Sequence, residues 1–211
     1  MLHQETVDAA TLELLKSLQI KEYLKGFYLV GGTALALYLG HRKSVDIDLF
    51  SNVSFDASGL LENLLQDYPY QLTLTASNTL RGSIKDIKVD LLAHRYAFLL
   101  EPVSFSGIEM LSMPDIAAMK LNAVSTSGQR SKDFIDIYYL LDHFDIADIL
   151  KYYKTKYRQE NDTFILKSII YFDDVDLSDW PVLVKDPGLK WNSVKKRLDK
   201  AVLGYIKKNN R

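Results

Sequence analysis

The chain has 211 residues, 47% of them hydrophobic, and a formal net charge of −1. This composition predicts a packed globular protein and excludes an intrinsically disordered chain. Cysteine is absent, which excludes disulfide bonds and thiolate metal sites, so any metal must be held by oxygen or imidazole ligands.

Predicted strands and helices alternate in the first half of the chain, and helices alone make up the second half. The apolar spacing predicts helices over residues 6–18, 33–39 and 55–68, and strands over 27–30, 45–50, 71–75 and 87–92. Residues 104–110 are expected to form a weaker strand or a hairpin that turns at Gly107. Further helices are expected over 114–125, 131–143, 146–157, 164–171 and 191–207. We therefore predict an α/β (α+β) fold. A mixed sheet flanked by helices would occupy residues 1–110, and a helical part that contributes to the active site would occupy 111–211.

Gly31 and Gly32 come after a predicted buried strand and before the short helix over 33–39. Glycine lets the backbone approach a ligand closely, and a helix N-terminus presents unsatisfied N–H groups to phosphate. By itself the pair is better explained as a tight strand-to-helix turn, which often uses glycine. It becomes informative in combination with the acidic strand that comes next in the chain.

Two aspartates occupy alternate positions of the strand predicted over 45–50. Residues two apart on a strand face the same side, so Asp46 and Asp48 should project together while Val45 and its apolar neighbours face the core. Adjacent carboxylates repel unless a cation lies between them, and their oxygens suit Mg²⁺ or Mn²⁺ shared with substrate phosphates. Exposed strands often carry acids, but a glycine turn, a short helix and Asp-x-Asp in succession indicate a metal–triphosphate site.

A third acid, Asp90, lies within the apolar strand predicted over 87–92. A buried unpaired carboxylate is costly, so a salt bridge to Lys88 or Arg95 is one explanation. The other is that Asp90 is a third metal ligand, or the base that takes the proton of an acceptor hydroxyl. The nearby Asp-x-Asp favours this second explanation.

Together these residues resemble the signature of the DNA polymerase β-like nucleotidyltransferase superfamily. Two further motifs, Asp-x4-Lys-x2-Ala and Arg-x-Lys-Asp-x2-Asp, resemble those of the AbiEii/AbiGii toxins of abortive-infection and type IV toxin–antitoxin systems. The four motifs occur in order between about residues 30 and 136. The residues that match the last two motifs are Asp115, Lys120, Ala123, Arg130, Lys132, Asp133 and Asp136.

The resemblance implies an Mg²⁺- or Mn²⁺-dependent enzyme that transfers a nucleoside monophosphate from a nucleoside triphosphate to an acceptor hydroxyl. It makes the end of a tRNA the expected acceptor and a cognate antitoxin a candidate partner. The implied metal ligands, which are also catalytic, are Asp46, Asp48 and Asp90. The implied nucleotide-binding residues are Gly31, Gly32, Thr33, Lys120 and Arg130. The implied catalytic residues of the helical part are Lys120, Lys132, Asp133 and Asp136.

The helical motifs also have explanations that do not need the family. Lys120 stands in an otherwise apolar helix and requires either a route to solvent or an anion such as a triphosphate. Lys132, Asp133 and Asp136 are neighbours on one helix, so a surface ion-pair cluster is the alternative to a catalytic role. Ser131 is expected to be the N-cap of that helix.

The C-terminal segment is basic, with nine Lys or Arg residues over 185–211 against two acids, Asp186 and Asp199. Such a segment forms either a phosphate-binding face for RNA or a solvated helix face. Tyr152, Tyr153 and Tyr157 stand among further basic residues, and they either stack on bases or pack beneath the helix.

Two other functions stay open at this point. One is an antibiotic-type enzyme that adenylylates a small hydroxylated molecule, and the other is a catalytically inactive fold that serves as a protein-binding module. No stretch approaches the roughly 20 apolar residues of a membrane helix, and residues 1–11 lack the features of a signal peptide. We expect a cytoplasmic protein with no membrane partner.

Overall fold

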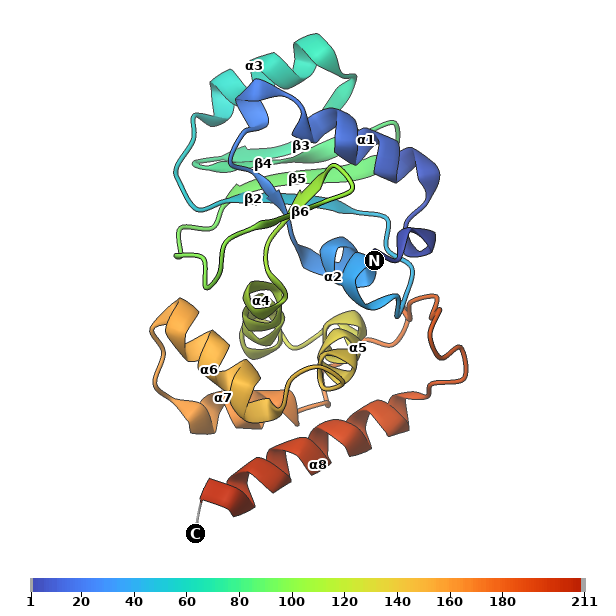
Figure 1. Ribbon diagram of the computed structural model, residues 1–211, viewed down its shortest axis with the longest axis vertical. Helices are drawn as coiled ribbons and strands as arrows, with labels where there is room; N and C mark the ends of the chain where they lie inside the picture. The colour runs from blue at the N-terminus through green and yellow to red at the C-terminus, as the bar shows by residue number, and fades with distance from the viewer. Residues whose placement is uncertain (1, 210–211) are drawn as a thin grey trace. The chain divides into compact units, whose positions relative to one another are not determined.

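The computed structural model describes residues 2–209, and the chain divides into two compact units, residues 1–112 and 113–211 (Figure 1). The first unit is a mixed sheet with helices packed on it, and the second unit is built from helices. The predicted fold class is therefore confirmed. Across residues 2–209, no helix combines the length and apolarity that crossing a membrane requires.

The first unit is organised around a seven-stranded sheet with the order β3-β4-β5-β2-β1-β7-β6. Its strands are β1 (Tyr28–Leu29), β2 (Ile47–Ser51), β3 (Tyr70–Ala76), β4 (Thr79–Ile84), β5 (Ile87–Ala93), β6 (Val103–Phe105) and β7 (Ile108–Met110). The pairs β2–β5 and β1–β7 are parallel and the other neighbouring strands are antiparallel. Two parallel neighbouring strands need a long connection between them, and here these connections contain helices and further strands.

Helices cover both faces of this sheet. They are α1 (Ala9–Gln19), α2 (Gly31–Leu39) and α3 (Ala57–Asp67), with 3-10 turns at η1 (Gln4–Thr6) and η2 (Glu22–Leu24). Figure 1 shows α1 and α3 on one face and α2 on the other. Asp8 and Asp56 cap α1 and α3, and α2 ends at Gly40, whose left-handed φ of 66° suits a helix C-terminus.

Two local expectations for this unit were wrong. Val45 does not face the core: its side chain is 59% exposed, because β2 begins only at Ile47 and the pleat that buries alternate residues starts there. The strand β4 was not expected at all. Arg81, Gly82 and Ser83 interrupt its apolar alternation, and it is a strand because it pairs with β3 and β5.

The second unit packs its helices around α4, which contacts α5, α6 and α7. Its helices are α4 (Met113–Thr126), α5 (Ser131–Leu140), α6 (Ile146–Tyr157), α7 (Asp162–Ile169) and α8 (Trp191–Asn209). Phe134 is fully buried and contacts the rings of Phe172 and Trp191 at centroid distances of 5.6 and 5.8 Å. Ser131 is not the N-cap of α5, because that position belongs to Arg130.

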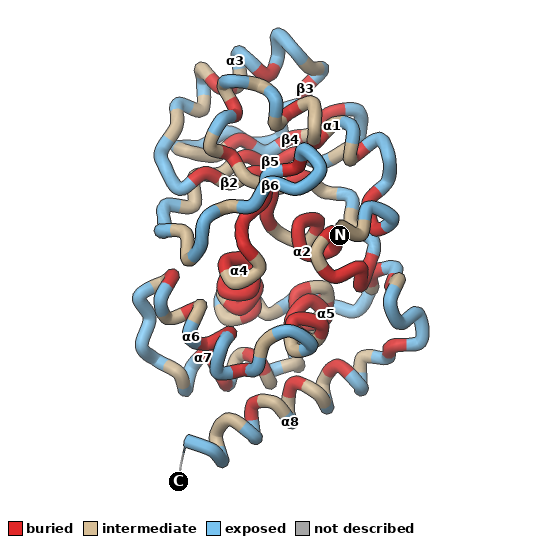
Figure 2. Tube along the Cα trace, in the orientation of Figure 1, coloured by how far each residue is buried: buried red, intermediate tan, exposed pale blue. Residues whose placement is uncertain are grey.

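Helix α8 is amphipathic. Its buried residues, Val194, Leu198 and Val202, recur every four positions and form one stripe. Figure 2 shows these buried positions alternating with exposed ones along the helix. The remaining faces of α8 carry most of its lysines.

Candidate active site

The first unit brings Asp48 and Asp90 together. Asp48 on β2 is the register partner of Asp90 on the parallel strand β5, and neighbouring strands lie about 4.8 Å apart. Partners in register project from the same face of a sheet, so the two carboxylates are neighbours. Asp46 lies two residues before Asp48, in the segment that leads into β2, and is half-buried.

The N-terminus of α2 lies against Asp48. Gly31, the first residue of the helix, has a φ of 70°, and a Cβ atom there would collide with Oδ2 of Asp48. The backbone N–H of Val30 donates to the Asp48 carbonyl at 2.9 Å. Both the conformation and the contact therefore require glycine at position 31.

Thr33 ties the same turn to the segment before β2. Its hydroxyl donates to the carbonyl of Asp46 and lies 2.9 Å from the hydroxyl of Ser44. The N-cap of α2 is Val30, whose side chain has no hydrogen-bond acceptor for the first N–H groups. This helix N-terminus is therefore suited to bind oxygen atoms of an anion beside the acids.

Asp90 has an asymmetric environment. Its side chain is 6% exposed, and its Oδ2 lies 3.1 Å from Nζ of Lys88 and 3.7 Å from Nε of Arg81. Its Oδ1 is buried and has no hydrogen-bond partner among residues 2–209. The expected salt bridge to Lys88 is present, whereas the second cation is Arg81, the cross-strand partner on β4, rather than Arg95.

Arg42 is a site residue that was not expected from the sequence. It is 4% exposed, its Nη1 donates to the Lys43 carbonyl at 3.1 Å, and a Cβ atom on Gly32 would collide with its Nη2. A guanidinium at this place adds positive charge where the dipole of α2 is already positive. The signal in the sequence was a basic residue between the glycine pair and Asp-x-Asp.

The acids do not form a closed metal cage. Among residues 2–209, no group of three or more His, Asp or Glu side chains lies close enough together to hold a metal ion. Mg²⁺ commonly binds one or two carboxylates and completes its coordination with water and substrate phosphates. Asp48 and the unpartnered Oδ1 of Asp90 fit that kind of open donor set.

In the second unit, Lys120 lies between two aspartates. Its Nζ is 2.7 Å from Oδ1 of Asp133 and 2.7 Å from Oδ2 of Asp136, and all three side chains are at most 9% exposed. Lys120 thus has buried carboxylates within its own unit as partners. The explanation as a surface ion-pair cluster is wrong, and Lys132 pairs instead with Asp179.

Asp115, the first residue of the Asp-x4-Lys-x2-Ala motif, belongs to a second buried ion pair. Its Oδ1 lies 2.7 Å from Nζ of Lys156, and both side chains are 0% exposed. The pair connects α4 to α6. Lys156 was not expected as a partner, because nothing in the sequence distinguishes it from the neighbouring lysines of α6, Lys151 and Lys154.

Arg130 is exposed at the start of α5. It borders a cavity of about 200 Å³ that is also lined by Ser131, Lys132, Asp176 and Asp179. The structure thus places Arg130, Lys132 and Asp133 at the N-terminal end of α5. Asp133 and Asp136 form ion pairs with Lys120.

Comparison with known proteins identifies the family. Residues 13–72 and 70–201 match the family model described as nucleotidyl transferase AbiEii toxin, type IV TA system. The chain belongs to this AbiEii family. An uncharacterized protein of Aquifex aeolicus, aq_aa25, is 33% identical to this AbiEii-family chain over 154 residues, which cover 70% of the chain and 74% of that protein. The predicted family is confirmed.

Solved structures share the fold. JHP933 from Helicobacter pylori superposes with a TM-score of 0.56 at 18% identity, covering 96% of this chain and 94% of that one. MenT4, a nucleotidyltransferase toxin from Mycobacterium tuberculosis, superposes with a TM-score of 0.59 at 14% identity, covering 89% and 78%. The arrangement of sheet and helices in this AbiEii-family chain is therefore that of nucleotidyltransferases.

Replacing Gly31 by alanine tests the contact between α2 and Asp48. Gly31→Ala is expected to cost about 1–2 kcal/mol of stability from the left-handed backbone, and to displace the Asp48 carboxylate. The matched control is Gly26→Ala, because Gly26 has a φ of 85° but open space around its Cβ position. We expect both variants to lower the unfolding midpoint in urea and only Gly31→Ala to lower kcat/KM, by tenfold or more (about 1.4 kcal/mol). Equal activity of the two variants would contradict the proposed importance of this contact.

Proposed function

We propose that the chain catalyses the Mg²⁺- or Mn²⁺-dependent transfer of a nucleoside monophosphate from a nucleoside triphosphate to a hydroxyl group of an RNA, with the end of a tRNA as the expected acceptor. The observation that carries this proposal is the pairing of Asp48 with Asp90 beside the N-terminus of α2. Membership of the AbiEii family supports the same reaction.

In the first unit, the acids would bind the metal and the N-terminus of α2 would bind the phosphates. Asp48 and Asp90, with Asp46 two residues before Asp48 in the chain, would hold the metal. When bound, the metal would neutralise phosphate charge and orient the reacting oxygens. The N–H groups of Gly32 and Thr33 would donate to phosphate oxygens, as a helix N-terminus does. Gly31 would let the phosphates come close to the backbone.

Besides binding the metal, Asp90 could act as the base of the reaction. Lys88 and Arg81 lie on its Oδ2 and stabilise the carboxylate, whereas its Oδ1 is not engaged within residues 2–209. That atom would either bind the metal or take the proton of the attacking hydroxyl. Attack on the α-phosphorus forms the new phosphoester bond, and the bond to the β-phosphate breaks to release pyrophosphate.

The helical unit is proposed to contribute to the same reaction. Asp133 and Asp136 hold the Lys120 ammonium in a fixed position, which preorganises its charge for the triphosphate or leaving group. Arg130 and Lys132 would bind phosphate oxygens from the start of α5. These roles derive from the family motifs and stay predictions.

RNA is favoured over a small molecule as acceptor by the charge of α8. The helix carries six Lys or Arg residues and one Asp, although the whole chain has a net charge of −1. A concentration of positive charge on one element matches a polyanion better than a small neutral acceptor. The type IV toxin–antitoxin family further suggests a cognate antitoxin as a partner.

A labelling screen tests the proposal. The purified protein is incubated with each α-labelled nucleoside triphosphate, with total tRNA or with small hydroxylated aminoglycosides, in Mg²⁺ or in EDTA. We expect label in RNA only in Mg²⁺. Label only in the small molecules would favour the antibiotic-type reaction. Absence of transfer together with absence of Mg²⁺–nucleotide binding in calorimetry would favour a non-catalytic binding module.

A further inference from the structure

Two adjoining cavities lie along α8 in the second unit. One cavity of about 820 Å³ lies between α8 and the turn that joins α5 to α6, and another of about 320 Å³ lies between α8 and α6. Both are lined by Ala147 and Tyr205, so they adjoin each other. We call the two cavities together the α6–α8 groove.

The ionic groups of the groove leave an excess of positive charge. The basic residues that line it are Lys151, Lys154, Arg197, Lys200 and Lys208. The acidic residues that line it are Asp142, Asp145 and Glu160.

Two of these acids have partners close to the turn between α5 and α6. Asp142 lies 2.8 Å from Arg197 and 3.0 Å from Lys185, and these cations hold the pKa of the Asp142 carboxyl below its usual value against the effect of burial. Asp145 accepts the N–H of Asp148 at 2.9 Å as the N-cap of α6.

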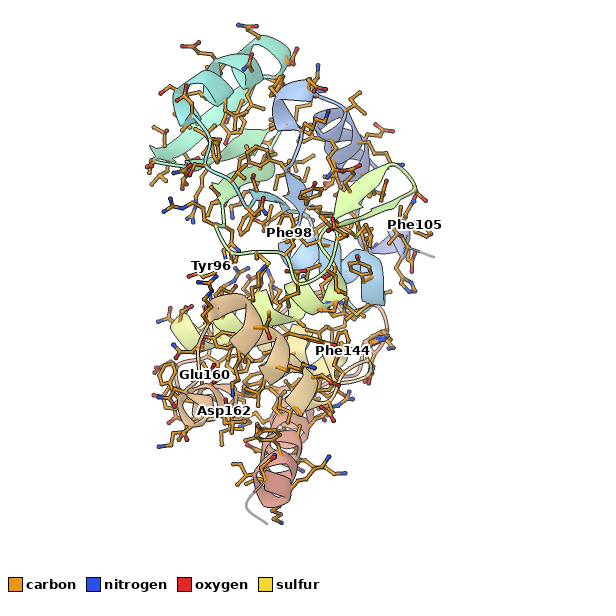
Figure 3. The ribbon with its side chains drawn as sticks, turned by 60° about the vertical axis from the view of Figure 1, so that its left-hand side comes forward. Tyr96, Phe98, Phe105, Phe144, Glu160 and Asp162 are labelled. Atoms are coloured by element: carbon orange, nitrogen blue, oxygen red, sulfur yellow. The ribbon has the colours of Figure 1, made fainter. Side chains whose placement is uncertain are left out.

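The third acid, Glu160, is exposed on the loop before α7 and is labelled in Figure 3. Its Oε2 lies 3.5 Å from Nζ of Lys154, and the same ammonium lies 3.1 Å from Oδ1 of Asp162. Lys154 and Arg197 are therefore the cations of the groove that its own acids neutralise.

Three lysines of the groove are available to a ligand. Among residues 2–209, Lys151, Lys200 and Lys208 have no carboxylate within ion-pair distance, and all three are exposed. Lys151 stands on α6 and the other two stand on α8, so the positive charge comes from both walls. An unneutralised row of ammonium groups along a groove is complementary to a chain of phosphates.

Two aromatic side chains line the same groove as these lysines. Phe144 packs edge-on against Tyr152 at a centroid distance of 5.2 Å, and the hydroxyl of Tyr205 lies 3.3 Å from Oδ2 of Asp162. Both rings line the groove and are half-buried. Aromatic rings in a groove that also carries lysines are typical of surfaces that bind single-stranded nucleic acid, where bases stack on the rings and phosphates contact the cations.

We propose that the α6–α8 groove binds the phosphodiester backbone of the RNA acceptor. The proposal rests on the proposed function and adds to it the surface that holds the acceptor. Asp142 lies just after the C-terminal end of α5, whereas Lys132 and Asp133 lie at its start. A helix of this length spans about 15 Å, so the groove is a subsite separate from the family motif on α5.

Charge-neutral variants on one helix test the groove. K200Q/K208Q removes two groove lysines, and K195Q/K196Q removes two lysines of α8 that do not line the groove. The binding of fluorescent tRNA is measured by anisotropy over a series of salt concentrations. We expect K200Q/K208Q to weaken binding at least fivefold at 0.1 M salt and to reduce the salt slope by about 0.7–0.9 for each phosphate that a lysine no longer neutralises. The control pair should stay within twofold of the unmodified protein.

Kinetics supply the second readout. K200Q/K208Q should raise KM for RNA while leaving KM for the nucleoside triphosphate and the melting temperature unchanged, because both lysines are exposed. Adding K151Q from the opposite wall should weaken RNA binding further.

The outcomes separate this inference from the proposed function. If the unmodified protein labels RNA but K200Q/K208Q and K195Q/K196Q bind RNA equally well, the groove inference is overturned and the proposed function stands. If the unmodified protein neither binds RNA nor labels it, both are overturned.

Discussion

Asparagine in place of Asp48 is expected to lower nucleotidyl transfer about 10²- to 10³-fold while the protein stays folded. The change keeps the size of the side chain and the backbone hydrogen bond from Val30, but removes one negative charge from the metal-binding pair. Asp90 cannot compensate fully, because its Oδ2 already faces Lys88 and Arg81. Pyrophosphate release and label transfer measure activity, and a thermal melt reports the fold.

The control for this variant is Asp86→Asn. Asp86 is an exposed acid in the turn between β4 and β5 with a φ of 67°, a conformation that asparagine tolerates well. It undergoes the same chemical change without touching the proposed site, so its activity should equal that of the unmodified protein. A folded Asp48→Asn protein with full activity would end the assignment of this carboxylate to the metal.

The largest loss of stability is expected from Lys156→Met. The variant removes the Lys156 ammonium from the buried carboxylate of Asp115, and breaking a buried pair from one side costs about 3–5 kcal/mol. Since domains are stable by only about 5–15 kcal/mol, the urea midpoint should fall sharply. Equilibrium unfolding in urea at neutral pH, followed by circular dichroism, measures the effect.

Two further variants show where that loss comes from. Lys151→Met changes an exposed lysine on the same helix and should alter the free energy of unfolding by less than about 0.5 kcal/mol. Asp115→Leu combined with Lys156→Met replaces the ion pair by apolar side chains, and it should recover most of the lost stability. A double variant as unstable as the single one would show that the cost does not come from an uncompensated charge.

Local sequence signals predicted much of the fold. Helix α6 has the bounds that its helical pattern predicted, and the structure shows that its start is fixed by a capping box of Asp145 and Asp148. Helix α5 was predicted to continue to residue 143 but ends at Leu140. The strand β4 could not be predicted, because its pairing with β3 and β5 decides its conformation and that information is not local.

Most residues of the candidate site could be predicted from the sequence, but their positions relative to one another could not. The alternation of Asp46 and Asp48 and the glycine turn are visible in the sequence. The register that places Asp48 beside Asp90 depends on strand pairing across about 40 residues of chain. The partners of Lys120 likewise come from another helix, so its burial between two carboxylates required the tertiary structure.

The strand order has a consequence for how the protein is made. The central strands β1 and β2 precede β5 and β7 in the chain, yet the parallel ladders join β2 to β5 and β1 to β7. At about 5–20 residues per second, a ribosome needs several seconds to deliver the partner of the earliest strand. During that time the nascent N-terminal segment exposes unpaired strand edges. Chaperone binding or a slower translation rate at this stage would therefore change the yield of folded protein.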